Sequence, residues 1–446
     1  MGRSPAISID KRSAQTTSLE TVIAGKYRLA DTGQIFPCPI KALQINSDLS
    51  GQESDLIDAL GIGGRLAIVC DRNTADVLGH RLSRSLRRAD LIVLDAPKAD
   101  DGNVEELSDK TRHNDALIAV GAGTLNDLCK YVSYRRHDAY AVFPTAASMN
   151  GYATATASIS RDGEKLSLQA APPKGVFVDL DVLTKAPARL TRAGVGDSLC
   201  RSTAQIDWFL SHSLLNTAYS QAPFDLQQDA EQALICQAPK LLQGDHDAMR
   251  ALVELLMLGG LGMLIVGNSQ PGSQGEHLIS HYIDMFCHPH PGTLHGEQVG
   301  LAAWTMARLQ DVILKDPSPP ILGETLIDTK SMKDRYGHLS PSLEEAMKAK
   351  AICGNRLEAI NAKLRENWTT LRQDLSAAAL TPKALSKALD AVGVAKDPTT
   401  LGIDPNFYGN AIRHARELRD RFTMLDLAGN AGRLEPFIEQ HLDHSL

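Results

Sequence analysis

The sequence predicts an α/β domain with a parallel sheet, followed by an all-α domain. Three observations support this prediction. At 446 residues the chain is longer than one hydrophobic core usually needs, so two domains are expected. Short apolar runs alternate with helical segments as far as residue 183, and helical periodicity alone dominates from about residue 187. We therefore expect a polar arm over residues 1–20, an α/β domain over 21–186 and a helical domain over 187–446.

The expected strands are apolar runs with almost no polar alternation. A run of this kind is typical of a parallel strand that is buried on both faces of its sheet. A helical pattern separates each run from the next, which indicates βαβ units. The runs cover residues 65–71, 91–97, 116–123, 139–145 and 174–183.

The second half of the chain carries apolar residues at spacings of three and four, the period of an amphipathic helix. The clearest segments are residues 196–212, 229–243, 246–260 and 342–368. The most apolar stretch, residues 255–266, is shorter than the roughly 20 residues that a membrane span needs, so we expect a buried core helix. Residues 317–325 are rich in proline and predict a surface loop.

Composition narrows the class of function. The formal net charge of -7 gives no basic surface for nucleic acid, so local donors must hold any anionic ligand. The seven cysteines are scattered and form no CxxC pair, as in a reducing compartment. The first twenty residues lack an apolar signal sequence, and Ala6 departs from the myristoylation pattern. We expect a soluble cytoplasmic protein with no nucleic-acid partner and no membrane insertion.

A glycine-containing turn follows the run 116–123. Gly121, Gly123 and Thr124 lie between an expected strand and an expected helix, where backbone N–H groups point at a phosphate. The spacing is not GxGxxG, so a plain turn with Thr124 as helix N-cap is the alternative. Thr145 and Ser148 follow the next strand at the same sheet edge, where ligands bind in open α/β sheets. Together the two turns favour a nucleotide-binding domain.

Three histidines and one aspartate in the helical half are candidates for a chemical role. His277 and His281 are four residues apart and share one helix face, but Glu276 precedes the pair, which disfavours an HEXXH protease. His295 begins another expected helix, and Asp197 in GVGD, taken alone, is interpreted as a helix N-cap. Each is individually more typical of a cap or a solvated histidine than of a ligand.

In combination these motifs resemble a known family. The order GAGTLND, PTAASMNGYA, GVGD, GEHLISH and LHGE is similar to that of bacterial and archaeal sn-glycerol-1-phosphate dehydrogenases, grouped with iron-containing alcohol dehydrogenases, glycerol dehydrogenases and 3-dehydroquinate synthases. The resemblance spans residues 65–428 and includes ELRDRFTMLDLA near the end. It implies a dehydroquinate synthase-like fold, an NAD(P)H cofactor and one divalent metal ion.

The resemblance also implies roles for individual residues. The metal ligands are Asp197, His277 and His295, with zinc expected and iron or nickel as alternatives. His281 relays a proton or contacts the substrate, with packing as the alternative. The residues expected to contact the dinucleotide are Asp71, Gly121, Gly123, Thr124, Asp127, Thr145 and Ser148. An acid at Asp71 favours NAD over NADP. Lys165 is expected to meet a substrate phosphate, with a surface lysine as the alternative.

Two positions depart from the family pattern. Asn150 stands where the family usually has Asp near the substrate hydroxyls, so we expect it to contact the substrate. Arg201 stands where some relatives have Lys, and its guanidinium group is expected to contact a substrate phosphate, with a surface acid as the alternative. The leading hypothesis is reduction of dihydroxyacetone phosphate to sn-glycerol 1-phosphate. The alternatives are an oxidoreductase or cyclase that acts on another phosphorylated polyol or sugar, and a non-catalytic protein that binds a nucleotide or sugar phosphate. The resemblance implies a homo-oligomer.

Overall fold

The computed structural model describes residues 19–29, 32–162 and 164–443. The predicted arm over residues 1–20 lies outside this part except for Leu19 and Glu20, which begin α1 (Leu19–Ile23).

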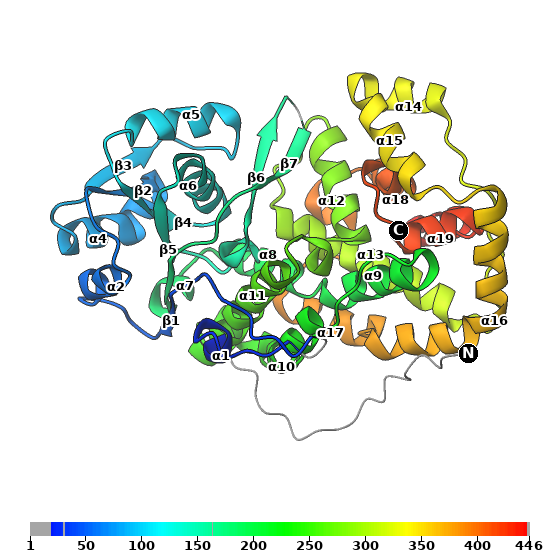
Figure 1. Cartoon of the computed structure of the whole chain (residues 1–446), viewed down its shortest axis with the longest axis horizontal. Helices are drawn as coiled ribbons and strands as arrows, with labels where there is room; N and C mark the ends of the chain where they lie inside the picture. Colours follow the sequence, from blue (N-terminus) through cyan, green and yellow to red (C-terminus); the bar gives the residue numbers. More distant parts are fainter. Residues whose placement is uncertain (1–18, 30–31, 163, 444–446) are drawn as a thin grey trace.

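The first half of the chain forms a six-stranded sheet, in the order β1-β8-β5-β4-β2-β3, with parallel pairing throughout. The predicted parallel sheet is therefore confirmed. Its strands are β1 (Ala42–Asn46), β2 (Leu66–Asp71), β3 (Asp90–Leu94), β4 (Ala116–Gly121), β5 (Ala139–Pro144) and β8 (Gly175–Asp179). A separate antiparallel hairpin consists of β6 (Thr156–Arg161) and β7 (Glu164–Gln169). Figure 1 shows this hairpin standing between the sheet and the helices of the second half.

Helices cover both faces of the sheet, which explains why its central strands are apolar along their whole length. Alternate residues of β2, such as Ile68 and Val69, enter two different hydrophobic clusters. The cluster around Ile68 packs on α2 (Glu53–Ala59), a π-helical turn (Ala75–Gly79) and α4 (His80–Ser85), and the cluster around Val69 packs on α5 and α6. The remaining helices of this half are α3 (Arg72–Thr74), α5 (Asp101–Lys110), α6 (Gly123–Arg136) and α7 (Leu180–Leu183).

Three details differ from the sequence prediction. The expected strand 174–183 ends at Asp179, because the Asp179 carboxylate accepts a hydrogen bond from Val182 N and so caps α7. Strand β1 and the hairpin β6–β7 were not predicted. Both carry polar and apolar residues mixed together, and most of their side chains are only partly buried.

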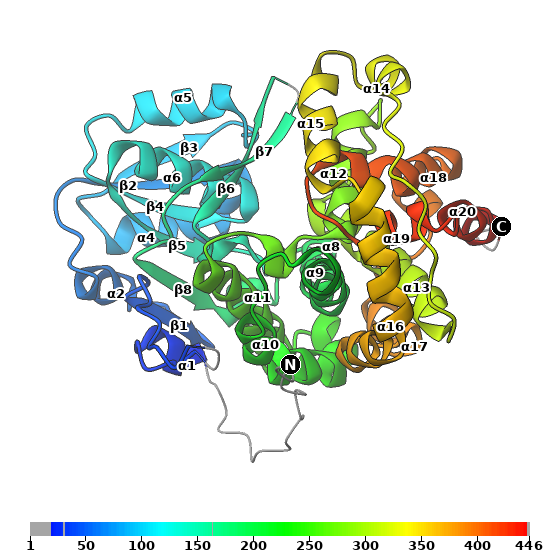
Figure 2. The same ribbon diagram turned by 45° about the vertical axis from the view of Figure 1, so that its right-hand side comes forward.

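The second half is helical, as predicted. After β8 the chain continues as helices, close to the predicted boundary at residue 187, although the division into domains stays a prediction. The α-helices are α8 (Ala188–Ser198), α9 (Arg201–Leu215), α10 (Ala222–Gln237), α11 (His246–Val266), α12 (Gly275–Phe286), α13 (His295–Lys315), α14 (Thr329–Tyr336), α15 (Ser340–Lys350), α16 (Gly354–Ala378), α17 (Pro382–Val392), α18 (Pro405–His414), α19 (Met424–Asn430) and α20 (Leu434–Asp443). Figure 2 shows them gathered on one side of the sheet.

Helix α11 contains the apolar stretch noted in the sequence. By length and composition it is long and apolar enough to cross a membrane, but 67% of its most apolar window is buried inside the fold. It packs against α8 and α10 and lies next to the short 3-10 turn Gly151–Ala153. These contacts are those of a core helix.

Candidate active site

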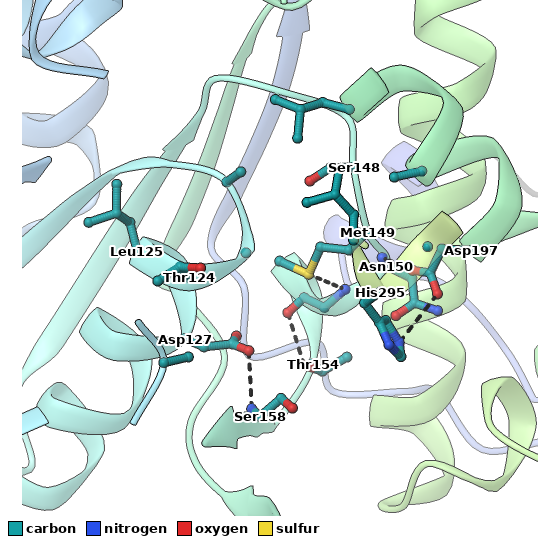
Figure 3. A pocket seen from close by; sticks show the side chains of 18 of the residues that line it. Thr124, Leu125, Asp127, Ser148, Met149, Asn150, Thr154, Ser158, Asp197 and His295 are labelled. Atoms are coloured by element: carbon teal, nitrogen blue, oxygen red, sulfur yellow. Dashed lines mark hydrogen bonds and ion pairs between the residues drawn. The ribbon is translucent and has the colours of Figure 1, made fainter. Parts of the chain in front are cut away.

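A single large cavity of about 1870 Å³ extends between the carboxyl edge of the sheet and the helical half. On the sheet side it is lined by residues that follow β2, β4 and β5. On the helical side it is lined by residues of α8, α12 and the start of α13. Figure 3 shows Thr124 and Asp127 on one side of this space, with Asn150, Asp197 and His295 on the other.

The sheet side contains the switch in strand order. The chain passes outward from β2 to β3 and then returns to the other side of β2 with β4, and a crevice at such a point is the usual ligand site of an open α/β sheet. Asp71 at the end of β2, and Gly123 and Thr124 after β4, line the cavity there. The N-cap of α6 is Ala122, so the interpretation of Thr124 as N-cap is wrong.

Gly121, unlike Gly123, does not line the cavity, so the expected contact between Gly121 and the dinucleotide has no support in the structure. It ends β4 and is buried, and a Cβ atom at this position would lie 2.3 Å from Leu125 Cδ1. Glycine at 121 therefore lets the first turn of α6 pack directly on the strand. The first residues of α6, Gly123 and Thr124, line the cavity, and the unpaired N–H groups of a helix N-terminus are suited to bind an anion.

Asp127, Thr145 and Ser148 also line the cavity, and all three are buried. The Asp127 carboxylate is already occupied, because Oδ2 accepts from Ser158 N at 3.0 Å and Oδ1 lies 3.6 Å from Lys130 Nζ. Burial raises the pKa of Asp127 although Lys130 opposes that change. Asp127 therefore holds the hairpin against α6. It lines the cavity near the turn that follows β4, but both of its carboxylate oxygens are engaged within the protein.

Asp197, His277 and His295 converge on the helical side. One ligand atom from each lies within 4.8 Å of the others. Asp197 Oδ1 is 3.6 Å from His277 Nε2 and 3.9 Å from His295 Nε2. Asp197 lies in the last turn of α8, so its interpretation as an N-cap is wrong. His277 lies in the first turn of α12, and His295 is the first residue of α13.

The donor set and its burial fit a divalent metal ion. Asp197 Oδ2 accepts a hydrogen bond from Asn150 N at 2.7 Å, whereas Oδ1 is buried and has no hydrogen-bond partner. A buried carboxylate oxygen without a partner is costly unless a cation compensates it. One carboxylate and two imidazoles are the ligands of many catalytic zinc sites, and they leave coordination positions open.

Hydrogen bonds at the far nitrogen of each ring orient both imidazoles. Glu276 Oε1 lies 3.0 Å from His277 Nδ1. Ser280 Oγ lies 3.2 Å from His295 Nδ1 and donates its own proton to Gln298 Oε1 at 2.7 Å. In the neutral form of each ring Nδ1 therefore carries the proton, which leaves the Nε2 lone pair free to bind a metal ion.

Cys200, Glu276 and His277 form a second group of potential ligands within 4.8 Å. In this group Glu276 Oε1 already accepts from Gln274 N at 2.8 Å, and Oε2 accepts from Thr203 Oγ1 at 3.2 Å. Burial raises the pKa of the Cys200 thiol well above its usual value, which disfavours the thiolate that binds metal. The group with the unpartnered Asp197 oxygen is the better fit.

The glycines of GVGD allow α8 to approach its neighbours closely enough to deliver Asp197. A Cβ atom at Gly194 would lie 1.9 Å from the carbonyl oxygen of Ala147, in the loop after β5. A Cβ atom at Gly196 would lie 2.2 Å from the carbonyl oxygen of Gly296, in the first turn of α13. Any larger residue would push these segments apart and separate Asp197 from His295.

The pKa is shifted differently in each of the three histidine rings. Burial lowers the pKa of His277, but Asp197 and Glu276 outweigh it and the pKa is raised to about 9. Burial, together with the charge of Lys165, lowers the pKa of His295 to about 4. Burial and the neighbouring His295 lower the pKa of His281 well below its usual value. At neutral pH only His277 is therefore protonated before a metal ion binds.

The structure brings together most of the residues expected to contact substrate. His281 lines the cavity, with its ring centre 6.4 Å from that of His277 and 6.3 Å from that of His295. Asn150 also lines the cavity, and its side chain makes no hydrogen bond with any of the described residues. Lys165 lies in β7 rather than in a turn, lines the cavity and forms an ion pair with Asp284 at 2.5 Å.

Arg201 is the exception. It does not line the cavity, because its guanidinium group donates to Glu231 Oε2 at 2.6 Å and to Gln205 Oε1 at 3.0 Å, in a buried network between α9 and α10. The expected contact between Arg201 and the substrate is therefore wrong. The guanidinium group of Arg201 instead binds a carboxylate of the protein, Glu231, and the sequence did not identify Glu231 as its partner.

Comparison with known proteins places this chain in a family. The sequence profile of the iron-containing alcohol dehydrogenase family matches residues 44–187. A glycerol-1-phosphate dehydrogenase of Bacillus subtilis is 31% identical over 373 residues, which cover 81% of this chain and 84% of the relative. The chain belongs to the glycerol-1-phosphate dehydrogenase family. An enzyme of the same name from Pyrococcus abyssi is 32% identical over 60% of this chain and 78% of its own length.

Solved structures agree on the fold of this glycerol-1-phosphate dehydrogenase family member. A probable glycerol dehydrogenase from Sinorhizobium meliloti superposes with a TM-score of 0.59 at 18% identity, covering 90% of this chain and 98% of the other. A glycerol dehydrogenase from Schizosaccharomyces pombe superposes with a TM-score of 0.58 at 16% identity, covering 91% of each. At these identities the comparison supports the two-part architecture. The roles of individual residues stay predictions.

Sequence reasoning missed several residues of the family member's site. In the sequence Glu276 was used only as an argument against a protease, and Ser280 was not singled out. In the structure Glu276 contacts His277 Nδ1 and Ser280 contacts His295 Nδ1. Arg419 and Arg421 line the cavity and lie in ELRDRFTMLDLA, which was noted only for its resemblance. The signal in that motif was two arginines separated by one residue, directly before the mostly apolar residues 422–428.

Proposed function

We propose that this chain reduces dihydroxyacetone phosphate to sn-glycerol 1-phosphate with NAD(P)H, using one divalent metal ion held by Asp197, His277 and His295. The observation that carries the proposal is the unpartnered Asp197 Oδ1, which faces both Nε2 atoms in the same cavity as the N-terminus of α6. Membership of the glycerol-1-phosphate dehydrogenase family supports the choice of substrate.

The dinucleotide is proposed to lie along the sheet side. Its pyrophosphate meets the backbone at Gly123 and Thr124, and Thr145 and Ser148 lie near the nicotinamide ribose. The Asp71 carboxylate, which accepts from Thr74 N at 2.8 Å, is positioned for the adenosine ribose. An acid there disfavours the extra phosphate of NADP, so NAD is the preferred form in this proposal.

Zinc is the proposed metal, with iron or nickel as alternatives that the same ligands accept. A divalent cation supplies positive charge that polarises a carbonyl group. The overall reaction consumes a ketone, NAD(P)H and one proton, and yields an alcohol and NAD(P)+. His281 is proposed to hold the substrate oxygen by donating a ring N–H, because its lowered pKa keeps the ring neutral at neutral pH.

One observation favours a second substrate class. Asn150 replaces the usual Asp at a position that lines the cavity, and its amide has no partner among the described residues. An amide offers two donors and one acceptor, whereas a carboxylate only accepts. A site of this kind discriminates strongly between hydroxyl patterns. The alternative is therefore another phosphorylated ketone or sugar, reduced by the same chemistry.

The test is a substrate panel on zinc-loaded protein, read from NADH absorbance, with Asn150→Asp assayed in parallel. We expect oxidation of NADH with dihydroxyacetone phosphate, loss of activity with a chelator and recovery with zinc. Asp197→Asn should lose both bound metal and activity, whereas Asp390→Asn on α17, outside the cavity, should keep both. Activity towards dihydroxyacetone phosphate that appears only in Asn150→Asp would assign the natural protein to the second class. Stoichiometric metal with no turnover of any ketone would refute the enzymatic proposal.

We also propose that the protein works in the cytoplasm as a homo-oligomer, as its resemblance to the family implies. Light scattering coupled to size-exclusion chromatography measures the mass directly. A mass of one chain at micromolar concentration would contradict the oligomer.

A further inference from the structure

Two arginines enter the cavity from a part of the chain that the proposed mechanism does not use. Arg419 and Arg421 lie in the connection between a 3-10 turn (Ala415–Leu418) and α19. Both side chains are half-buried.

Buried groups fix the backbone of this connection. Lys350, itself buried, donates to the carbonyl oxygen of Arg421 at 2.9 Å and forms an ion pair with Asp426 at 2.9 Å. Met424 N donates to the buried Asp207 Oδ1 at 3.0 Å. Both guanidinium groups therefore project from a rigid segment, so little conformational entropy opposes ligand binding.

The charge of the two arginines is not balanced within the protein. Among the described residues, no carboxylate lies within 4.0 Å of either guanidinium, although the chain as a whole carries a net charge of -7. Asp420, between them in sequence, is exposed. Lys165 differs, because Asp284 already neutralises it. Burial and the charge of Arg419 lower the pKa of Arg421 to about 10, although the more distant charges of Asp420 and Glu276 oppose this change.

Each guanidinium keeps hydrogen-bonding capacity for a ligand. Arg421 donates to the carbonyl oxygen of Ser273 and to Ser269 Oγ, the latter at 2.7 Å, which uses two of its five donors. Within the described part of the chain, Arg419 donates only to the carbonyl oxygen of Lys165, at 3.5 Å. The remaining N–H groups suit the oxygens of a phosphate, which arginine binds by paired hydrogen bonds.

The arginines lie on the histidine side of the cavity. Arg419, Lys165 and His281 line both the large cavity and a smaller one of about 420 Å³ beside it. Arg421 binds the loop Ser269–Ser273, which leads directly into α12 and His277. An anion bound here would lie next to Asp197, His277 and His295 rather than at the turn that follows β4.

We propose that Arg419 and Arg421 bind the phosphate group of the substrate, and that they, rather than Lys165, make the enzyme specific for a phosphorylated ketone. This inference rests on the proposed function for the identity of the substrate. The competing explanation is that both arginines only brace the loops that they contact. The two explanations differ in what happens to a substrate that has no phosphate.

The first experiment compares dihydroxyacetone phosphate with dihydroxyacetone in Arg419→Gln, Arg421→Gln and the control Arg413→Gln. Arg413 is bound to Glu435 outside both cavities. Loss of one charge-assisted bond should lower kcat/KM for dihydroxyacetone phosphate by about 10-fold to 100-fold, mainly through KM. The kcat/KM for dihydroxyacetone and the zinc content should not change. Equal losses with both substrates, in variants that melt like the natural protein, would favour bracing and overturn the proposal.

The second experiment does not depend on turnover. Calorimetry measures the binding of inorganic phosphate to the zinc-loaded protein in saturating NAD+, which blocks the pyrophosphate site. We expect binding that weakens at least tenfold in either glutamine variant and recovers in part in Arg419→Lys and Arg421→Lys, which keep the charge. No phosphate binding by the natural protein, or binding unchanged in the variants, would overturn the proposal. If phosphate binds as expected but dihydroxyacetone phosphate is not reduced, only the proposed function fails.

Discussion

Glu276→Gln tests whether the carboxylate behind His277 controls the metal site. Glu276 is fully buried, and its Oε1 faces His277 Nδ1 at 3.0 Å while its Oε2 accepts from Thr203 Oγ1. Glutamine has the same shape and keeps an oxygen for the histidine. Its amide nitrogen can donate to Thr203 Oγ1 in place of the lost acceptor. The substitution therefore removes a charge without emptying space.

The magnitude follows from the change of bond type. A hydrogen bond to a charged group contributes about 1.5–3 kcal/mol and a neutral one about 0.5–1.5 kcal/mol, so the loss is about 1–1.5 kcal/mol. That loss corresponds to about a tenfold weaker affinity for zinc, near the lower end of the roughly 10-fold to 100-fold effect of removing such supporting groups. Glu276→Ala should cost more, because it also leaves the buried Gln274 N–H without its acceptor.

The assay is competition for zinc between the protein and a fluorescent chelator at pH 9.5, with metal content checked by mass spectrometry. This pH lies above the pKa of His277, about 9, so a lower pKa of His277 in the variant does not offset the loss of affinity. The matched control is Glu254→Gln, a carboxylate of α11 that does not line the cavity. The expected order of zinc affinity is natural protein and control first, Glu276→Gln next and Glu276→Ala last. If Glu276→Gln binds zinc within twofold of the control, Glu276 does not support His277 and the argument is wrong.

Three further predictions concern packing, a buried charge and pH. Gly194→Ala forces a Cβ atom against the Ala147 carbonyl oxygen, so we expect a loss of stability of about 1–3 kcal/mol and a lower Tm. An unchanged Tm would contradict the close contact between α8 and the loop after β5. Lys350→Met leaves Asp426 buried and unpaired, which should cost about 3–5 kcal/mol in denaturant unfolding, with partial recovery in the double variant that adds Asp426→Asn. Because the pKa of His277 is raised to about 9 without metal and a ligand must be neutral, zinc binding at pH 7.5 should release one proton from it, and affinity should rise with pH until about pH 9. Calorimetry in buffers of different ionisation enthalpy measures that proton, and an enthalpy independent of the buffer would count against it.

The part of the fold that could be predicted is the part buried on both faces. Strands β4 and β8 are buried at every position, so their sequences are continuously apolar and stand out. Strand β1 lies at the sheet edge and has a single buried side chain, and β7 has none. Their pairing depends on neighbours distant in the chain, which the local pattern does not contain.

The residues of the site could be predicted only where several motifs occur in the same order as in a known family. Asp197 alone resembles a cap, and its selection as a ligand came from the family resemblance rather than from its own surroundings. The prediction for Arg201 was wrong because its partner Glu231 lies on the next helix, and the local sequence around Arg201 does not indicate that contact. Arg419 and Arg421 were missed for the same reason. An arginine that forms no ion pair can be recognised only when the positions of the neighbouring elements are known.

The three ligand atoms belong to three separate helices, α8, α12 and α13, and an unfolded chain would scatter them. A cation that binds only the folded form shifts the folding equilibrium, by about 2.7 kcal/mol when its concentration is 100 times its Kd. We therefore expect each metal to raise the melting temperature in proportion to how tightly it binds. A melting series would then rank zinc, iron and nickel before any substrate is known, and metal starvation would reduce the amount of folded protein as well as its activity.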